Sequence, residues 1–143
     1  MTLFLDANII IYRVEAIEPF NRQVLAMVQE LVALHPNSGF AVSRLSMMEC
    51  MVKPLREQNS ADVERYRGFF ASSGLQIIEV SSLVLETATL LRARHGLRTP
   101  DAIQAASAMS IRGPVTFLTG DRQFSKVPGL NVRLVQCQNE KIV

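Results

Sequence analysis

The stretch Thr2-Leu3-Phe4-Leu5-Asp6-Ala7-Asn8 combines a short apolar run, an aspartate and the start of a helical pattern. An apolar run of this length, followed at once by a helix, is typical of a strand that is buried on both faces of a parallel sheet. Asp6 stands where the strand passes into the helix, and capping that helix is the ordinary role of an aspartate there. The stretch predicts a strand–helix unit of an α/β domain, with a carboxylate at the carboxyl end of its strand.

The rest of the chain repeats this alternation of short apolar runs and helical segments. Further strands are expected at residues 40–42, 75–80, 115–118 and 132–135, and helices at residues 8–13, 20–34, 43–56, 61–71, 83–94 and 100–111. In the helix at 43–56, the side chains expected to face inward are Leu45, Met48, Val52 and Leu55. This order predicts a three-layer α/β/α sandwich around a mostly parallel sheet of about five strands, with residues 1–143 as a single domain.

Composition indicates an ordinary globular protein. With 143 residues and 48% hydrophobic content, the chain can bury a core without covalent staples. Cys50 and Cys137 lie far apart and form no Cys-x-x-Cys pair, so neither a disulfide framework nor a zinc site is indicated. The first residues lack the basic lead of a secretory signal, and no apolar run is long enough to span a bilayer. A cytoplasmic protein with no membrane partner is expected.

Four acidic residues occupy positions that suggest chemistry, although each also has an ordinary explanation. Asp6 could cap a helix, Glu49 could pair with Lys53 on a helix surface, Asp101 could favour the dipole of the helix opened by Thr99-Pro100, and Asp121 could serve a turn. In parallel α/β sheets, however, ligands bind beyond the carboxyl ends of the strands, where these acids are expected to gather. Four carboxylates there would repel one another unless protonated or bound to a cation, and Mg²⁺ and Mn²⁺ prefer oxygen ligands.

The basic residues suit an anionic substrate better by their type than by their number. The net charge is only +2, but 12 of the 15 basic residues are arginine, whose planar fork matches phosphate. The candidate phosphate contacts, all close in sequence to Asp101 or Asp121, are Arg94, Arg98, Arg122 and Lys126. The alternative interpretation is that these basic side chains simply belong to the solvated surface of a helix.

In order and spacing, four short pieces of the chain resemble the PIN-domain family, and within it the VapC-type toxin ribonucleases of toxin–antitoxin pairs. These pieces are Leu5-Asp6-Ala7-Asn8, Ser43 with Glu49, Thr99-Pro100-Asp101-Ala102 and Thr119-Gly120-Asp121-Arg122-Gln123-Phe124. The resemblance implies that Asp6, Glu49, Asp101 and Asp121 form an acidic quartet that binds Mg²⁺ or Mn²⁺. Asn8, Ser43 and Thr119 match polar positions that support such a site.

The resemblance also implies an activity and partners. The activity would be metal-dependent endoribonuclease cleavage, leaving a 5′-phosphate and a 3′-hydroxyl, and the partners would be RNA, a cognate antitoxin and a second copy of the chain. The apolar faces of residues 20–34 and 61–71 are candidate dimer surfaces. The chain departs from the family pattern at Gln104, where many relatives carry a histidine.

Two other classes of function fit the sequence less well. A phosphatase of the haloacid-dehalogenase type would need an aspartate where Asn8 stands, and the seven glycines are scattered instead of forming a phosphate-binding loop. A catalytically silent PIN-fold module for protein or RNA binding usually loses acids, whereas all four are present. The RNA that is cut and the choice between Mg²⁺ and Mn²⁺ do not follow from the sequence.

Overall fold

The computed structural model describes residues 1–135, and Cys137 lies outside that range. The strands are β1 (Thr2–Leu5), β2 (Gly39–Ser43), β3 (Leu75–Ile78), β4 (Val115–Thr119) and β5 (Val132–Leu134). The helices are α1 (Ala7–Val14), α2 (Phe20–Leu34), α3 (Arg44–Arg56), α4 (Ser60–Phe70), α5 (Ser82–His95) and α6 (Thr99–Met109), followed by the 3-10 helix η1 (Arg122–Lys126). Every expected element is present, but Thr99, which the sequence predicts as the N-cap of a helix starting at Pro100, is already helical, and Arg98 occupies the N-cap position of α6.

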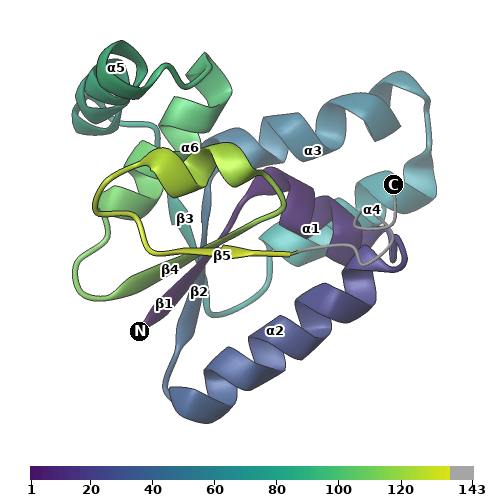
Figure 1. The fold of residues 1–143 in the computed structure, drawn as a ribbon. Coiled ribbons are helices and arrows are strands. Elements are labelled where there is room, and N and C mark those ends of the chain that lie inside the picture. Colours follow the sequence, from purple (N-terminus) through teal and green to yellow (C-terminus); the bar gives the residue numbers. More distant parts are fainter. Residues whose placement is uncertain (136–143) are drawn as a thin grey trace, which may run out of the picture.

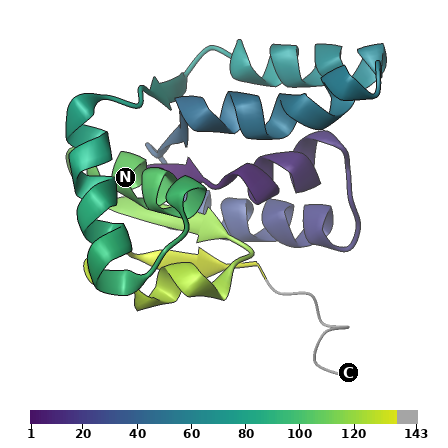
Figure 2. The same cartoon turned by 90° about the horizontal axis from the view of Figure 1, so that it is seen from above.

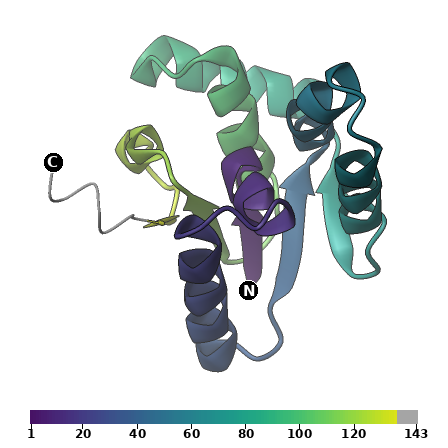
Figure 3. The ribbon, with the colours of Figure 1, turned by 90° about the vertical axis from the view of Figure 1, so that its right-hand side faces the viewer.

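The five strands form one parallel sheet in the order β3-β2-β1-β4-β5, which confirms the predicted fold class (Figure 1). β1 is the central strand, with β2 on one side and β4 on the other. Figure 3 shows β1 and β2 running to the edge of the sheet at which α1 and α3 begin. In the register of β1 and β4, Leu5 is opposite Leu118, so Asp6, which follows β1, and Thr119, the last residue of β4, lie side by side at the edge of the sheet.

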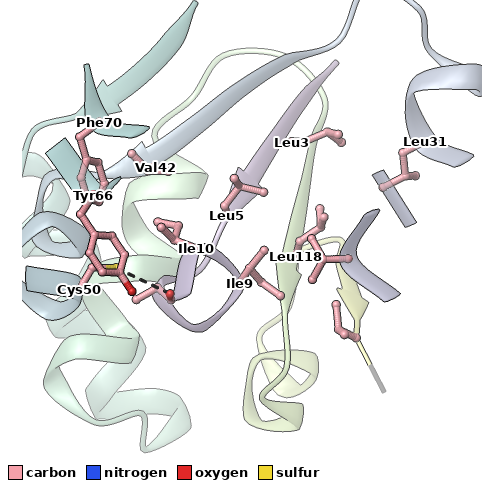
Figure 4. Close-up of a cluster of buried hydrophobic side chains, with 13 residues drawn as sticks. Leu3, Leu5, Ile9, Ile10, Leu31, Val42, Cys50, Tyr66, Phe70 and Leu118 are labelled. Carbon is pink, nitrogen blue, oxygen red and sulfur yellow. Dashed lines mark hydrogen bonds between the residues drawn. The ribbon is translucent and has the colours of Figure 1, made fainter. Parts of the chain in front are cut away.

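Helices cover both faces of the sheet. Successive side chains of β1 point to opposite faces, so β1 contributes to a core on each of them. Leu3 and Leu5 belong to the core cluster built with α1, α2 and α4, part of which is drawn in Figure 4. Phe4 belongs to the cluster built with α5 and α6, where it stacks on Phe117 with ring centroids 5.3 Å apart. Figure 2 shows α1 beside α2 and α3 beside α4. The sheet is therefore a rigid frame whose carboxyl edge positions the acids.

The side of α3 that faces inward differs from the one expected. The expected inward residues Met48, Val52 and Leu55 are 60%, 45% and 52% exposed, and Leu45 is half-buried. The buried residues of α3 are Ser46, Cys50 and Pro54. Cys50 Sγ donates a hydrogen bond to the carbonyl oxygen of Ala7 in α1, at 3.8 Å (dashed in Figure 4). The prediction was wrong because the face of α3 that meets neighbouring helices carries small side chains: Cys50 contacts α1, and Ser46 accepts a hydrogen bond from Gln104 of α6.

Candidate active site at the carboxyl edge of the sheet

Asp6 follows β1 and is buried, with 6% of its surface exposed. Its Oδ1 accepts a 2.8 Å hydrogen bond from Ala7 N, so it does cap α1, and its Oδ2 accepts a 2.7 Å hydrogen bond from the hydroxyl of Thr119. Burial raises the pKa of Asp6 to about 7; the two hydrogen bonds oppose that rise, and repulsion by Glu49 and Asp101 adds to it. The negative charge of Asp6 is thus poorly compensated by the chain alone.

Thr119 connects Asp6 to Asp121. The hydroxyl of Thr119 is fully buried, donates to Asp6 Oδ2, and accepts a 3.0 Å hydrogen bond from Asp121 N. Asp121 Oδ1 in turn accepts a 2.9 Å hydrogen bond from Gln123 N and caps η1. The backbone of Asp121 is therefore fixed close to Asp6, while its carboxylate also has the ordinary turn role.

Asn8 holds the loop after β4 against α1. Its Oδ1 accepts a 3.3 Å hydrogen bond from Gly120 N. A Cβ atom on Gly120 would lie 3.4 Å from the hydroxyl of Tyr12, so this loop passes close to α1. Asn8 thus orients the segment that carries Asp121.

Glu49 extends from α3 toward α6, not along the surface of its own helix. Glu49 Oε1 accepts a 2.8 Å hydrogen bond from the amide of Gln104, and in the described part of the chain no ion pair joins Glu49 to Lys53. Partial burial raises the pKa of Glu49, and repulsion by Asp101 adds to that rise, whereas the hydrogen bond from Gln104 and the charge of Arg98 oppose it. The surface ion pair considered for Glu49 is therefore wrong.

Asp101 lies in the first turn of α6, as predicted, with 14% of its side chain exposed. Arg98 Nε lies 3.3 Å from Asp101 Oδ2, although 77% of the Arg98 side chain is exposed. The charge of Asp101 acts on the pKa of both Asp6 and Glu49. Asp6, Glu49 and Asp101, from three different elements, therefore lie near enough to repel one another.

Ser43 is buried where β2 passes into α3. Its Oγ accepts hydrogen bonds from Leu45 N, at 3.1 Å, and from the hydroxyl of Ser107 in α6, at 3.3 Å. Ser43 thereby fixes the start of α3 against α6. This contact sets the direction from which Glu49 approaches the other acids.

The donor set suits a hard divalent cation. The oxygens of carboxylates are the ligands that Mg²⁺ and Mn²⁺ prefer, and the raised pKa of Asp6 and of Glu49 marks charge that a cation would compensate. Within residues 1–135, no three His, Cys, Asp or Glu side chains are arranged as a ready-made metal site. The acids are therefore neighbours whose side chains would have to turn toward a shared ion.

The basic residues singled out in the sequence differ in their surroundings. Arg94, Arg122 and Lys126 are exposed, on α5 and η1. Arg98 is also exposed but forms the ion pair with Asp101. Of the four, Arg98 is thus the one in direct contact with the acids.

A groove in the surface lies away from the acids. This apolar groove has a volume of about 460 Å³, and none of the four acids lines it. Its walls include Val24, Leu25 and Val28 of α2, and Phe69 and Leu75 near the turn from α4 to β3.

In residues 1–135, no helix combines the length and apolarity that a bilayer-spanning helix needs.

Comparison with known proteins supports the same fold. The model of the PIN domain family matches residues 3–130, whereas no curated protein matches the chain. The chain is similar to VapBC2 from Rickettsia felis bound to a DNA fragment from their promoter, with a TM-score of 0.70 and 21% identity over 95% of this chain and 100% of that chain. It is also similar to a toxin–antitoxin complex from Klebsiella pneumoniae, with a TM-score of 0.65 and 27% identity over 95% and 98% of the two chains. For VapBC-1 from nontypeable Haemophilus influenzae the TM-score is 0.69, with 16% identity over 94% and 98%.

The family model thus spans almost all of the described residues, and the matches to the similar structures cover 94–95% of the chain. The chain belongs to the PIN domain family.

Proposed function

We propose that the chain is a metal-dependent endoribonuclease and the toxin of a toxin–antitoxin pair. The observation that carries this proposal is that Asp6, which follows β1, lies near Glu49 of α3 and Asp101 of α6, whose charges both raise its pKa, in a chain of the PIN domain family. Acids from distant parts of a chain rarely gather at a ligand-binding edge for stability alone, because their charges oppose burial.

In this proposal Asp6, Glu49, Asp101 and Asp121 hold Mg²⁺ or Mn²⁺, with Asn8, Ser43 and Thr119 in support. A bound divalent ion lowers the pKa of a water molecule and stabilises the charge on the leaving oxygen of a phosphodiester. Because the pKa of Asp6 is about 7, its carboxyl group would release its proton to solvent when a cation binds. Thr119 keeps the carboxylate of Asp6 in place through its 2.7 Å hydrogen bond.

The proposed substrate is RNA, bound mainly through its backbone. Arg94, Arg98, Arg122 and Lys126 are the candidate phosphate contacts, because they are exposed and close in sequence to the acids. Phe117 and Phe124 are buried and cannot stack on bases, and Tyr12, which lies beside Gly120, is half-buried and stacks on Phe20. Recognition of RNA shape and phosphates therefore fits better than reading of stacked bases.

Two protein partners belong to the proposal: a cognate antitoxin and a second copy of the chain. The antitoxin is supported by the likeness to toxin–antitoxin structures. For the dimer, the surface expected on α2 keeps Leu25 and Leu34 exposed, whereas Val24, Leu31 and Tyr66 of α2 and α4 are buried in the core. Exposed apolar side chains also lie on α3 (Met48, Val52, Leu55) and α5 (Leu83, Leu85, Leu90), which adds these two helices to the candidate dimer surfaces.

The decisive experiment combines metal removal with substitution of the acids. The purified chain is incubated with cellular RNA and Mn²⁺, with and without EDTA, and the new 5′ ends are sequenced. We expect discrete metal-dependent cleavage that D6N and D101N each reduce by at least about a hundredfold while the circular dichroism spectrum is unchanged.

A matched control replaces an acid outside the site. Glu64 is 71% exposed on α4, so E64Q should cut as well as the wild type. Cleavage that survives EDTA, or that persists in both D6N and D101N, would contradict the nuclease proposal and favour a catalytically silent binding module.

A further inference from the structure

Gln104 occupies an unusual position for a long polar side chain. It lies on α6 with 1% of its surface exposed, surrounded in sequence by the buried residues Ala102, Ala105 and Ala106. Its Nε2 donates two hydrogen bonds of 2.8 Å to α3, one to Ser46 Oγ and one to Glu49 Oε1. A single buried amide thus bridges one turn of α3.

The amide of Gln104 is poorly explained by stability alone. Its Oε1 is buried and has no hydrogen-bond partner in the described residues, and an unpaired buried acceptor costs free energy. Turning the amide over would place this oxygen against the carboxylate of Glu49, where two acceptors would repel each other. The observed orientation therefore satisfies Glu49 and leaves the acceptor of Gln104 unpaired.

The same amide lies one turn from Asp101 on α6, because residues three apart share a helix face. One face of α6 thus presents an acid and, one turn on, the donor that holds a second acid from α3. A glutamate that is only half-buried has several free torsions, and a hydrogen bond from a fully buried donor restricts them. No hydrogen bond to Glu49 Oε2 occurs within residues 1–135, so that oxygen remains available to a ligand.

We propose that Gln104 is a positioning residue, which holds Glu49 toward Asp6 and Asp101 so that the carboxylate of α3 joins the binding of a divalent cation. This inference rests on the proposed function, because it concerns the same acids. Partners that orient the ligands of a metal typically change metal affinity by about tenfold or more when they are removed.

The test compares Q104M with S46A. Methionine keeps the length of the side chain but removes the donor, whereas alanine at position 46 breaks the other hydrogen bond of the same amide and leaves the one to Glu49. Mn²⁺ binding is measured on the metal-free protein by isothermal titration calorimetry, and Tm without metal is measured in parallel. We expect Q104M to bind Mn²⁺ about tenfold more weakly without a lower Tm, and S46A to bind it within about twofold of the wild type.

A double-variant cycle separates positioning from general support of the fold. If Gln104 acts through Glu49, Q104M should weaken Mn²⁺ binding much less in the E49Q background than in the wild type. Should Q104M not fold, Q104L serves in its place.

The outcomes distinguish this inference from the proposed function. Equal Mn²⁺ affinity of Q104M and the wild type, or an equal loss in S46A and Q104M, would overturn the positioning role while leaving the nuclease proposal intact. A wild-type protein that binds no Mn²⁺ would overturn both.

Discussion

The hydroxyl of Thr119 donates a 2.7 Å hydrogen bond to Asp6 Oδ2 across two neighbouring parallel strands. The hydroxyl oxygen of Thr119 also accepts a hydrogen bond from Asp121 N, so one buried hydroxyl orients two residues of the acidic edge. This contact follows directly from the register that sets Leu5 opposite Leu118. Much of the site therefore depends on the pairing of β1 with β4.

Thr119→Val should impair the proposed nuclease with little change of fold. Valine has nearly the same shape, but it removes the donor to Asp6 and the acceptor for Asp121 N. Because the hydrogen bond from Thr119 lowers the pKa of Asp6, that pKa should rise further in the variant and the activity should need a higher pH. We expect about a tenfold lower cleavage rate at neutral pH, measured as a pH–rate profile.

Thr116→Val is the matched control for that substitution. Thr116 is on the same strand, is equally buried, and its Oγ1 accepts a 3.2 Å hydrogen bond from Asn131. It lies at the opposite end of β4, so its replacement should lower stability but leave the pH–rate profile unchanged. Identical profiles for both variants would argue against an orienting role of Thr119.

The stability of the metal-free protein should fall as the pH rises through the range in which Asp6 ionises. Its folded pKa of about 7 lies above the ordinary value of 3.8, so the stabilising contribution is fully present below about pH 4 and is lost by about pH 7. The free energy of unfolding should therefore fall by at most about 4 kcal/mol between these two pH values. Urea unfolding in EDTA at a series of pH values should show this decline in the wild type and a flatter curve in Asp6→Asn.

Parallel curves for the wild type and Asp6→Asn would mean that the folded protein does not disfavour the charge of Asp6. Added Mn²⁺ provides the complementary measurement. If a cation compensates the acids, the wild type should gain stability above pH 7, whereas Asp6→Asn should gain much less.

RNA binding should depend on salt through the exposed basic residues. The double variant Arg122→Ala/Lys126→Ala should bind RNA more weakly, and the slope of log Kd against log salt should fall by about 0.7 for each phosphate that the variant no longer neutralises. Fluorescence anisotropy with labelled RNA over a series of KCl concentrations measures both quantities.

Arg65→Ala is the control for the basic residues, because Arg65 is on α4, where it pairs with Asp62. For Arg65→Ala, the slope of log Kd against log salt should equal that of the wild type. An unchanged slope in the double variant as well would remove η1 from the proposed RNA surface.

A dimer built across α3 should be sensitive to charge on its exposed apolar face. Val52→Glu places a carboxylate on that face without touching the core, since Val52 is 45% exposed. We expect this variant to be monomeric by light scattering at concentrations where the wild type is dimeric. Leu34→Glu, at a 66% exposed position on α2, should leave the dimer intact, and the reverse result would return the interface to α2.

The elements and their order could be predicted from the sequence because they depend on local patterns. Short apolar runs mark the buried strands, and the alternation with helices fixes a parallel sheet. Asp6 and Thr119 each follow such a run, so their approach at one edge of the sheet was foreseeable. Asp6 caps α1 through Ala7 N and also lies near Glu49 and Asp101, so its capping role and its place among the acids of the site are compatible.

The surroundings of Glu49 could not be predicted in the same way. Which face of α3 packs inward depends on its close approach to α1, and the partner of Glu49 is Gln104, 55 residues further along the chain. A long amide among the alanines of α6, and a serine three residues before Glu49, were the signals available. These signals can be interpreted only when the relative position of α3 and α6 is known, and the periodicity of each helix does not encode that position.

The order of the strands also bears on synthesis. Asp6 is synthesised well before its partner Thr119, which follows 113 residues later on β4, the strand that pairs with β1 on the side opposite β2. A nascent chain that stops before Val115 carries three of the four acids but cannot complete the edge of the sheet that orients them. If the proposed activity is correct, a product truncated before β4 would be harmless to the cell that makes it, and toxicity would begin only after β4 has been translated.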